Sequence, residues 1–199
     1  MKSALIIFVR NPEPGKVKTR IAKTMGNEKA LEVYKELLLH TYDITKDISC
    51  DKFVFYADQI TKNDLWETSF YHKKLQQGND LGQRMLLAFR ELFGLGYQSI
   101  QIIGSDCMEL TTDIIETGFN RLHENEVVIG PSTDGGYYLL GMRLLVPDIF
   151  YKKEWSTEKV FSSTLADIKK LSLSYFLLPE LSDIDTEKNW LDHQTKIYQ

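Results

Sequence analysis

The stretch IQIIGSDCMEL, residues 100–110, decides the fold of this chain. Its three isoleucines form a short apolar run, which is typical of a strand buried on both faces of a sheet. Gly104 and Ser105 end the run, and Asp106 then places a carboxylate at its tip. In open α/β sheets, ligands bind beyond the C-terminal ends of the strands. We therefore expect Asp106 either to face a ligand or to cap a turn.

Apolar runs of strand length alternate with segments of helical periodicity along the rest of the chain. This alternation predicts an α/β fold with three layers, α/β/α, around a mostly parallel central sheet. Asp80 is positioned to cap the second helix, and Ser156 or Thr157 the fourth. The expected strands are 4–9, 52–56, 73–76, 99–103, 127–129, 137–142 and 173–178, and the expected helices are 28–44, 81–93, 113–122, 156–170 and 186–197.

Length and composition limit the classes of protein that the chain can represent. Its 199 residues, 43% of them hydrophobic, fit one domain spanning 1–199. No apolar stretch approaches the roughly 18 residues of a membrane span, and two cysteines are too few for a disulfide framework, so we expect a cytoplasmic protein. The formal net charge of −4 argues against nucleic acid as a partner.

The segment FVRNPEPGKVKTRIAK, residues 8–23, follows the first expected strand and is rich in cations. Its prolines and Gly15 predict an irregular loop. Lys18 and Arg20 are suited to bind the phosphates of a nucleotide, although the segment has no Walker motif. The alternative is a solvated basic turn.

The segment QQGNDLGQRM, residues 76–85, places Gly78 and Gly82 around the start of a helix. Exposed amides at such a start can receive a nucleobase or a phosphate. The alternative is that the glycines serve a tight turn and that Arg84 is an ordinary surface charge.

The segment IGPSTDGGYYLLG, residues 129–141, carries Asp134-Gly135-Gly136 between two apolar strands. The glycines leave room for a ligand, and Asp134 can bind a hydroxyl group. Asp-Gly is also a favoured pair in hairpin turns, so a hairpin is the alternative. The nearby Trp155-Ser156-Thr157 lines an acceptor pocket or simply packs.

The segment LSDIDTEKNW, residues 181–190, carries two acids two positions apart. In an extended segment, Asp183 and Asp185 face the same side. Two neighbouring carboxylates repel each other unless a cation lies between them. The alternative is that Asp185 caps the final helix.

Taken together, the segments FVRNPEPGKVKTRI, QGNDLGQRM, IGSDCMEL, GPSTDGGYYLLG and DIDT resemble a bacterial family of the GT-A-type nucleotide-diphospho-sugar transferase superfamily. That family is related to 2-phospholactate guanylyltransferase and molybdenum-cofactor guanylyltransferase. The resemblance runs from Phe8 to Thr186 and implies a GT-A, Rossmann-like fold. The glycosyltransferase D-x-D signature is absent, because the central position reads Gly104-Ser105-Asp106.

The resemblance also implies roles for particular residues. Lys18, Arg20 and Asp106 are the expected catalytic residues, and Asp106, Asp183 and Asp185 the expected ligands of Mg²⁺ or Mn²⁺. The expected nucleotide-binding residues are Arg10, Gly15, Lys18, Arg20, Gln77, Gly78, Asp80, Gly82, Arg84 and Ser105. The expected acceptor-binding residues are Asp134, Gly135, Gly136, Tyr137, Trp155, Ser156 and Thr157.

The expected activity is metal-dependent nucleotidyl transfer from a nucleoside triphosphate to a small anionic acceptor. One alternative is a glycosyltransferase that uses a nucleotide-sugar donor. Another is a nucleotide-binding module without catalytic activity.

Overall fold

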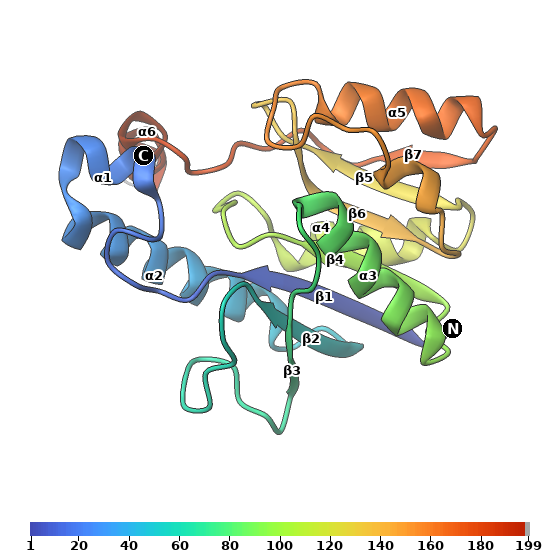
Figure 1. Ribbon diagram of the computed structural model, residues 1–199, viewed down its shortest axis with the longest axis horizontal. Helices are drawn as coiled ribbons and strands as arrows, with labels where there is room; N and C mark the ends of the chain where they lie inside the picture. Colours follow the sequence, from blue (N-terminus) through green and yellow to red (C-terminus); the bar gives the residue numbers. More distant parts are fainter. Residues whose placement is uncertain (198–199) are drawn as a thin grey trace.

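The computed structural model of the chain describes residues 1–197. Their strands form a seven-stranded sheet in the order β3-β2-β1-β4-β6-β5-β7 (Figure 1). The strands are β1 (Ser3–Val9), β2 (Asp51–Tyr56), β3 (Tyr71–Leu75), β4 (Ser99–Ile103), β5 (Val127–Pro131), β6 (Tyr137–Met142) and β7 (Tyr175–Leu177). The helices are α1 (Thr19–Met25), α2 (Asn27–Thr45), α3 (Leu81–Gly94), α4 (Thr112–Arg121), the 3₁₀ helix η1 (Pro147–Phe150), α5 (Val160–Lys170) and α6 (Glu187–Ile197).

The sheet is mostly parallel, as the alternation of elements predicted. Strands β3, β2, β1 and β4 run parallel to their neighbours, and β7 runs parallel to β5. Only β6, among the described strands, is antiparallel to both of its neighbours, β4 and β5. The C-terminal ends of the parallel strands therefore meet at one edge, where β6 begins.

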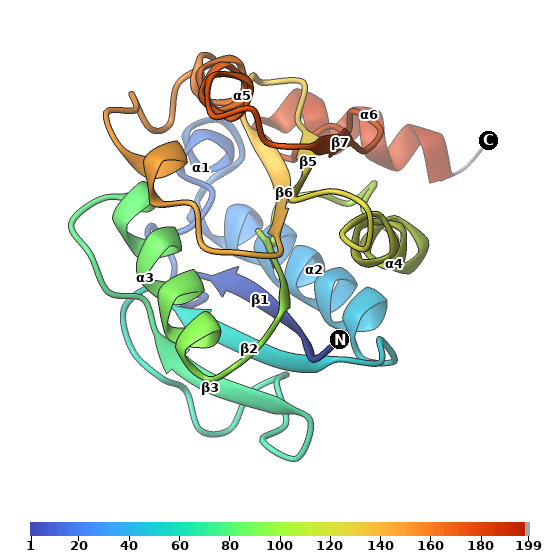
Figure 2. The ribbon, with the colours of Figure 1, turned by 90° about the vertical axis from the view of Figure 1, so that its right-hand side faces the viewer.

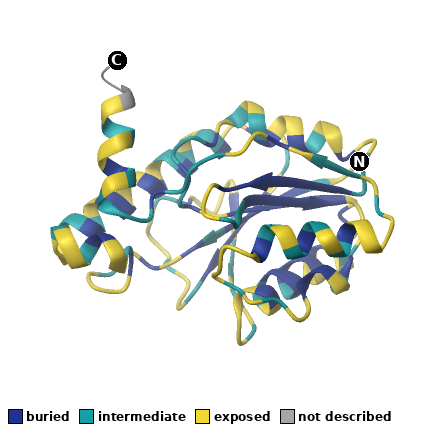
Figure 3. Ribbon diagram, turned by 90° about the horizontal axis from the view of Figure 1, so that it is seen from above, coloured by how far each residue is buried: buried dark blue, intermediate teal, exposed yellow. Residues whose placement is uncertain are grey.

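Two apolar layers hold the helices on the two faces of the sheet. Side chains alternate along β1, so that Leu5 and Ile7 pack on the side of α2 and α4, whereas Ala4 and Ile6 pack on the side of α3 and α5. Figure 2 shows α2 and α4 on one face and α3 on the other. The central strands are buried along their length, as Figure 3 shows, so their ends form a rigid base for the loops that follow.

Two expectations about local structure are wrong. Neither Ser156 nor Thr157 caps α5, which begins only at Val160. Ser156 has a left-handed backbone with φ 64°, and the Thr157 hydroxyl donates to the carbonyl of Glu154, which closes a turn before the helix. The cause is that the loop bends to reach the edge of the sheet instead of continuing directly into a helix.

The second wrong expectation concerns the first loop, which contains a helix that was not predicted because its prolines favour an irregular loop. Helix α1 starts immediately after Lys18, which has a left-handed backbone with φ 45°. Helix α6, at the end of the described chain, lies against α1 (Figure 1). The expected loop over 8–23 is therefore irregular only up to Lys18.

Within residues 1–197, no helix is both long enough and apolar enough to cross a membrane.

The Asp-Gly-Gly segment forms the turn between β5 and β6, as the hairpin alternative predicted. Gly135 N–H donates to the carbonyl of Ser132 at 3.0 Å, and the Gly135 carbonyl accepts from Phe161 N–H at 2.8 Å. Gly135 has φ 87°, and a Cβ atom at this position would overlap the backbone of Glu158. The glycine thus allows the loop before α5 to pack directly on the turn.

We expect Gly135→Ala to lower the free energy of unfolding by more than about 1 kcal/mol, because the added carbon meets backbone and the positive φ is unfavourable. Urea denaturation measures this change. The control is Gly94→Ala at the end of α3, where a Cβ atom would meet no atom within 4 Å. Equal midpoints for the two variants would contradict the close packing at Gly135.

Candidate active site

The loops at the C-terminal edge of the sheet enclose a cavity of about 780 Å³. Its walls come from the loops after β1 and β4, the start of α3, the β5–β6 turn, the loop before α5 and the segment after β7. This is the edge at which α/β proteins bind ligands. The cavity is therefore the candidate active site.

Lys18 holds two of the acidic segments together. Its ammonium group lies 2.6 Å from Asp106 Oδ1 and 3.4 Å from Asp185 Oδ1, and its side chain is only 6% exposed. Arg20 Nη1 adds a looser contact of 3.5 Å to Asp185 Oδ2. The ammonium group is shielded from water, whereas the Asp106 and Asp185 side chains remain 47% and 39% exposed, so solvent still screens part of the attraction. The first loop, the end of β4 and the segment after β7 are therefore connected by charge.

The segment 183–185 lies between β7 and α6 and turns both of its acids toward the cavity. Ile184 is buried, and its N–H donates to the carbonyl of Asp106 at 2.8 Å, while Asp183 and Asp185 both line the cavity. The cap of α6 is Thr186, whose hydroxyl accepts from Asn189 N–H. The alternative role of Asp185 as the helix cap is therefore wrong.

Asp183 is the carboxyl group that this arrangement affects most. Burial, followed by the charges of Asp106, Asp134 and Asp185, raises its pKa from 3.8 to about 7 against the opposing effect of Lys18. The acids around it therefore carry more negative charge than the neighbouring lysine compensates.

Tyr34, in α2, lines the cavity although it was not among the predicted site residues. Its hydroxyl accepts from Arg10 N–H at 2.8 Å and lies 3.2 Å from the Arg10 carbonyl and 3.3 Å from Ser105 Oγ. Burial raises its pKa to about 12, with a further contribution from the charge of Asp106. The phenol thus joins the first loop to the end of β4. A tyrosine in an apolar helix stripe is the available signal, since a buried phenol needs a partner.

Gln76, directly after β3, lines the cavity, whereas the predicted Gln77 does not. Its amide nitrogen donates to the carbonyls of Val9 and Phe55, and its oxygen accepts from Arg84 Nη1 at 3.4 Å. Nothing in the local sequence distinguishes Gln76 from Gln77, because the contacts that select it come from β1 and β2.

Asp80 caps α3 as predicted, by accepting from Gln83 N–H at 2.8 Å. Gly82 lies beneath the indole of Trp155, and a Cβ atom there would overlap the ring. Its small size therefore positions an aromatic side chain of the cavity.

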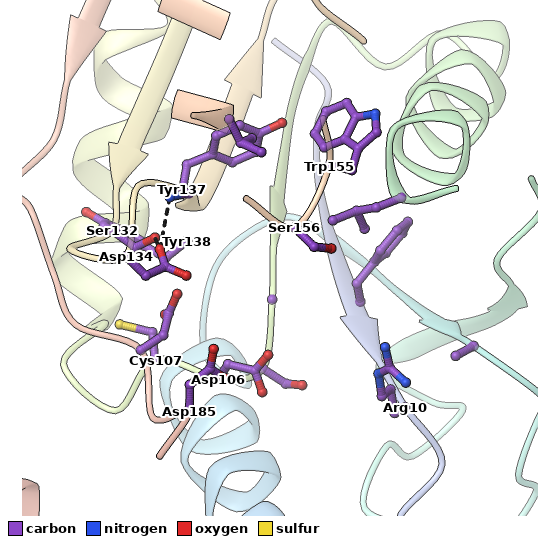
Figure 4. Close-up of a pocket in the computed structure, with 18 of the residues that line it drawn as sticks. Arg10, Asp106, Cys107, Ser132, Asp134, Tyr137, Tyr138, Trp155, Ser156 and Asp185 are labelled. Carbon is purple, nitrogen blue, oxygen red and sulfur yellow. Dashed lines mark hydrogen bonds between the residues drawn. The ribbon is translucent and has the colours of Figure 1, made fainter. Parts of the chain in front are cut away.

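The structure brings most of the predicted site residues to this cavity and leaves a few outside its lining. Asp134 Oδ1 accepts from Ser132 Oγ at 2.5 Å and from Gly136 N–H at 2.9 Å, which fixes its carboxylate at the cavity edge (Figure 4). The predicted residues in the lining are Arg10, Lys18, Arg20, Asp80, Arg84, Ser105, Asp106, Asp134, Gly136, Tyr137, Trp155, Ser156, Thr157, Asp183 and Asp185. Those outside it are Gly15, Gln77, Gly78, Gly82 and Gly135.

The carboxylates are oxygen ligands of the kind that Mg²⁺ and Mn²⁺ prefer. Within residues 1–197, however, no three His, Cys, Asp or Glu side chains are close enough to hold a metal ion by themselves. Mg²⁺ in phosphate-transferring sites commonly uses one or two carboxylates together with substrate phosphates and water. Asp106 and its neighbours fit an ion of that kind, which shares its coordination with a nucleotide.

The fold and the position of this cavity define a class of proteins, the nucleotide-diphospho-sugar transferase fold. CMP:2-keto-3-deoxy-manno-octonic acid synthetase in complex with CTP has this fold, with a TM-score of 0.61 and 11% identity over 100% of this chain and 99% of that chain. So does 4-diphosphocytidyl-2C-methyl-D-erythritol synthase from Anaerococcus prevotii DSM 20548, with a TM-score of 0.62 and 9% identity over 99% and 96%. At such identities the similarity concerns the fold alone.

A more similar structure comes from Desulfovibrio desulfuricans G20, where the protein is provisionally named a nucleotide-diphospho-sugar transferase. It matches with a TM-score of 0.86 and 31% identity over 93% of this chain and 83% of that chain. Residues 40–157 match the family described as "Uncharacterized protein conserved in bacteria (DUF2064)", and the chain belongs to this family. Among curated proteins, none matches the chain.

The raised pKa of Asp183 predicts a pH dependence of stability. Between about pH 4 and pH 7 the folded protein holds a proton at Asp183 that the unfolded chain releases, so stability falls as pH rises through this range. We expect Asp183→Asn to have a higher free energy of unfolding than the wild type at pH 8 in EDTA, by at most about 4 kcal/mol. Urea denaturation should therefore give a higher midpoint for this variant. The control is Asp192→Asn on the exposed side of α6. A lower midpoint for Asp183→Asn at pH 8 would contradict this description of the acids.

Proposed function

We propose that the chain is a metal-dependent transferase that binds a nucleotide in this cavity and catalyses nucleotidyl transfer. The supporting observation is the distribution of charge, because the first loop and α3 present the cations Arg10, Lys16, Lys18, Arg20 and Arg84 to the cavity. We call these five residues the basic wall. A nucleoside triphosphate needs more cationic partners than a nucleotide-sugar does, since it has one phosphate more and no sugar attached to the last one.

In this proposal, Lys18 and Arg20 bind the β- and γ-phosphates and stabilise the charge that develops on departing pyrophosphate. Tyr34 holds the Arg10 backbone next to Ser105, which keeps the two phosphate-facing loops in register. The bond between the α- and β-phosphates breaks as an acceptor oxygen attacks the α-phosphorus. Placing these groups in line supplies much of the rate, because little covalent chemistry falls to the protein.

Asp106, with Asp183 or Asp185, would hold the divalent ion. A bound Mg²⁺ stabilises negative charge on phosphate oxygens as a Lewis acid. Lys18 contacts both Asp106 and Asp185, so we infer that its ammonium group moves to the phosphates when nucleotide and metal bind.

We expect Lys18→Ala to weaken nucleoside triphosphate binding by at least about tenfold, because charge-assisted contacts to phosphate contribute about 1.5–3 kcal/mol. Isothermal titration calorimetry with each of the four common nucleoside triphosphates and Mg²⁺ measures the effect. The matched control is Lys23→Ala in α1, the helix that follows Lys18, because it removes an equal charge outside the cavity lining. Unchanged affinity in Lys18→Ala would contradict the phosphate role.

We expect Asp106→Asn to reduce turnover by at least about 10²-fold while the circular dichroism spectrum stays that of the wild type. It should also weaken Mn²⁺ binding to the nucleotide-bound protein, which electron paramagnetic resonance measures directly. Asp113→Asn on the exposed first turn of α4 is the matched control. Wild-type Mn²⁺ affinity in Asp106→Asn would remove this residue from the metal site.

Sugar transfer from a nucleotide-sugar is the second candidate. The name of the 31% identical protein favours it, and so does Trp155, whose ring borders the cavity. The two reactions release different products, since nucleotidyl transfer yields pyrophosphate whereas sugar transfer yields a nucleoside diphosphate. Product analysis by ³¹P nuclear magnetic resonance therefore decides between them.

A further inference from the structure

The lining of the cavity changes charge sign along the chain. Every cation of the basic wall belongs to the first 84 residues. Lining residues from 102 onward contribute five acids and, within the described chain, no Lys, Arg or His. The acids are Asp106, Asp134, Glu158, Asp183 and Asp185. The cavity thus has one wall suited to phosphates and another that repels them.

Three of these acids form what we call the acidic wall: Asp134, Glu158 and Asp183. They gather at the β5–β6 turn, because the Glu158 backbone packs on Gly135 and the charge of Asp134 acts on Asp183. Asp106 and Asp185 differ from them, since both contact Lys18. Figure 4 shows Asp134 across the cavity from Arg10.

Among the described residues, Lys18 offsets the acidic wall only in part: its contacts are with Asp106 and Asp185, and its effect on the pKa of Asp183 is smaller than those of burial and of the neighbouring acids. Lys153 is buried in an ion pair with Asp167, and Lys152 and Lys159 lie outside the cavity lining. Both hydrogen bonds to Asp134 end on Oδ1, so its Oδ2 can accept a hydrogen bond from a ligand. A carboxylate can only accept while ionised, so it selects ligand groups that donate.

Aromatic rings provide an independent observation at the same end of the cavity. Tyr137 and Trp155 both line it, and Figure 4 draws them above the acids. The face of an aromatic ring carries partial negative charge, so it attracts cations and C–H groups and disfavours anions. Trp155 is held in place by its contact with Gly82.

We propose that this end of the cavity binds the body of the acceptor, and that this body carries hydroxyl or amino groups and no negative charge. The inference rests on the proposed transferase function and specifies its second substrate. It restricts the expectation of an anionic acceptor: an acceptor phosphate can lie only at the reacting position near Lys18, while the rest of the molecule is a neutral polyol or an amine.

Three probes with one ring test the proposal without requiring turnover. Methyl glucoside is neutral, glucosamine is cationic and glucuronate is anionic, whereas their pyranose rings are alike. Saturation-transfer nuclear magnetic resonance on the full chain, without nucleotide, measures their affinities. We expect the neutral or the cationic probe to bind at least about fivefold more tightly than glucuronate, and the ratio between those two distinguishes a polyol from an amine. Tighter binding of glucuronate, equal affinities or no binding of any probe overturns the proposal.

Variants of the acidic wall locate the effect. The measured quantity is the ratio of the affinity for methyl glucoside or glucosamine to the affinity for glucuronate. Asp134→Asn and Glu158→Gln should each reduce this ratio by about two- to fivefold, the range that one partly exposed charge contributes. Glu154→Gln, on the same loop but outside the cavity lining, is the matched control and should keep the wild-type preference. Unchanged preference in both wall variants overturns the assignment to this wall. Nucleotide affinity, measured separately, reports on the proposed function, so the two failures are distinguishable.

Discussion

The contact of one ammonium group with two carboxylates organises the C-terminal edge of the sheet, where the cavity lies. Lys18 follows β1, Asp106 follows β4 and Asp185 follows β7, so the three side chains come from segments far apart in sequence. Lys18 has a left-handed backbone and directly precedes α1, and its side chain lines the cavity. The lysine side chain is almost fully buried and the two carboxylates are partly exposed, so solvent screens the attraction only in part and the contact connects the three segments.

The same contact also sets a limit on the charge that the site tolerates. One lysine between Asp106 and Asp185 leaves Asp183 beside other acids, and the pKa of Asp183 rises to about 7 as a result of its burial and of these neighbours. A site in this condition gains stability when cationic charge enters it. The excess of acids over the lysine therefore favours a ligand that brings cationic charge, as the divalent ion of the proposed function would.

Much of the fold was predictable because it depends on local patterns. The strands at 99–103 and 137–142 have the predicted bounds, since their apolar runs end at turn residues on both sides. Asp183 and Asp185 line one cavity as their spacing predicted, because alternation is a property of any extended chain. Gln76 and Tyr34 were missed for the opposite reason: their roles come from contacts with β1, β2 and β4, which no local pattern encodes. The late start of α5 likewise follows from packing on Gly135.

The topology explains why the two ends of the cavity differ in charge. The parallel strands β1, β2 and β3 lie on one side of β4, and their loops and the start of α3 carry the cations. On the other side, β6 reverses direction and joins β5 through a tight turn, which leaves Asp134 and not a long basic loop at the edge. Segments of opposite charge thus meet above β4, where Asp106 lies next to Lys18. A substrate that spans β4 must match both signs, which favours a molecule that is anionic at one end only.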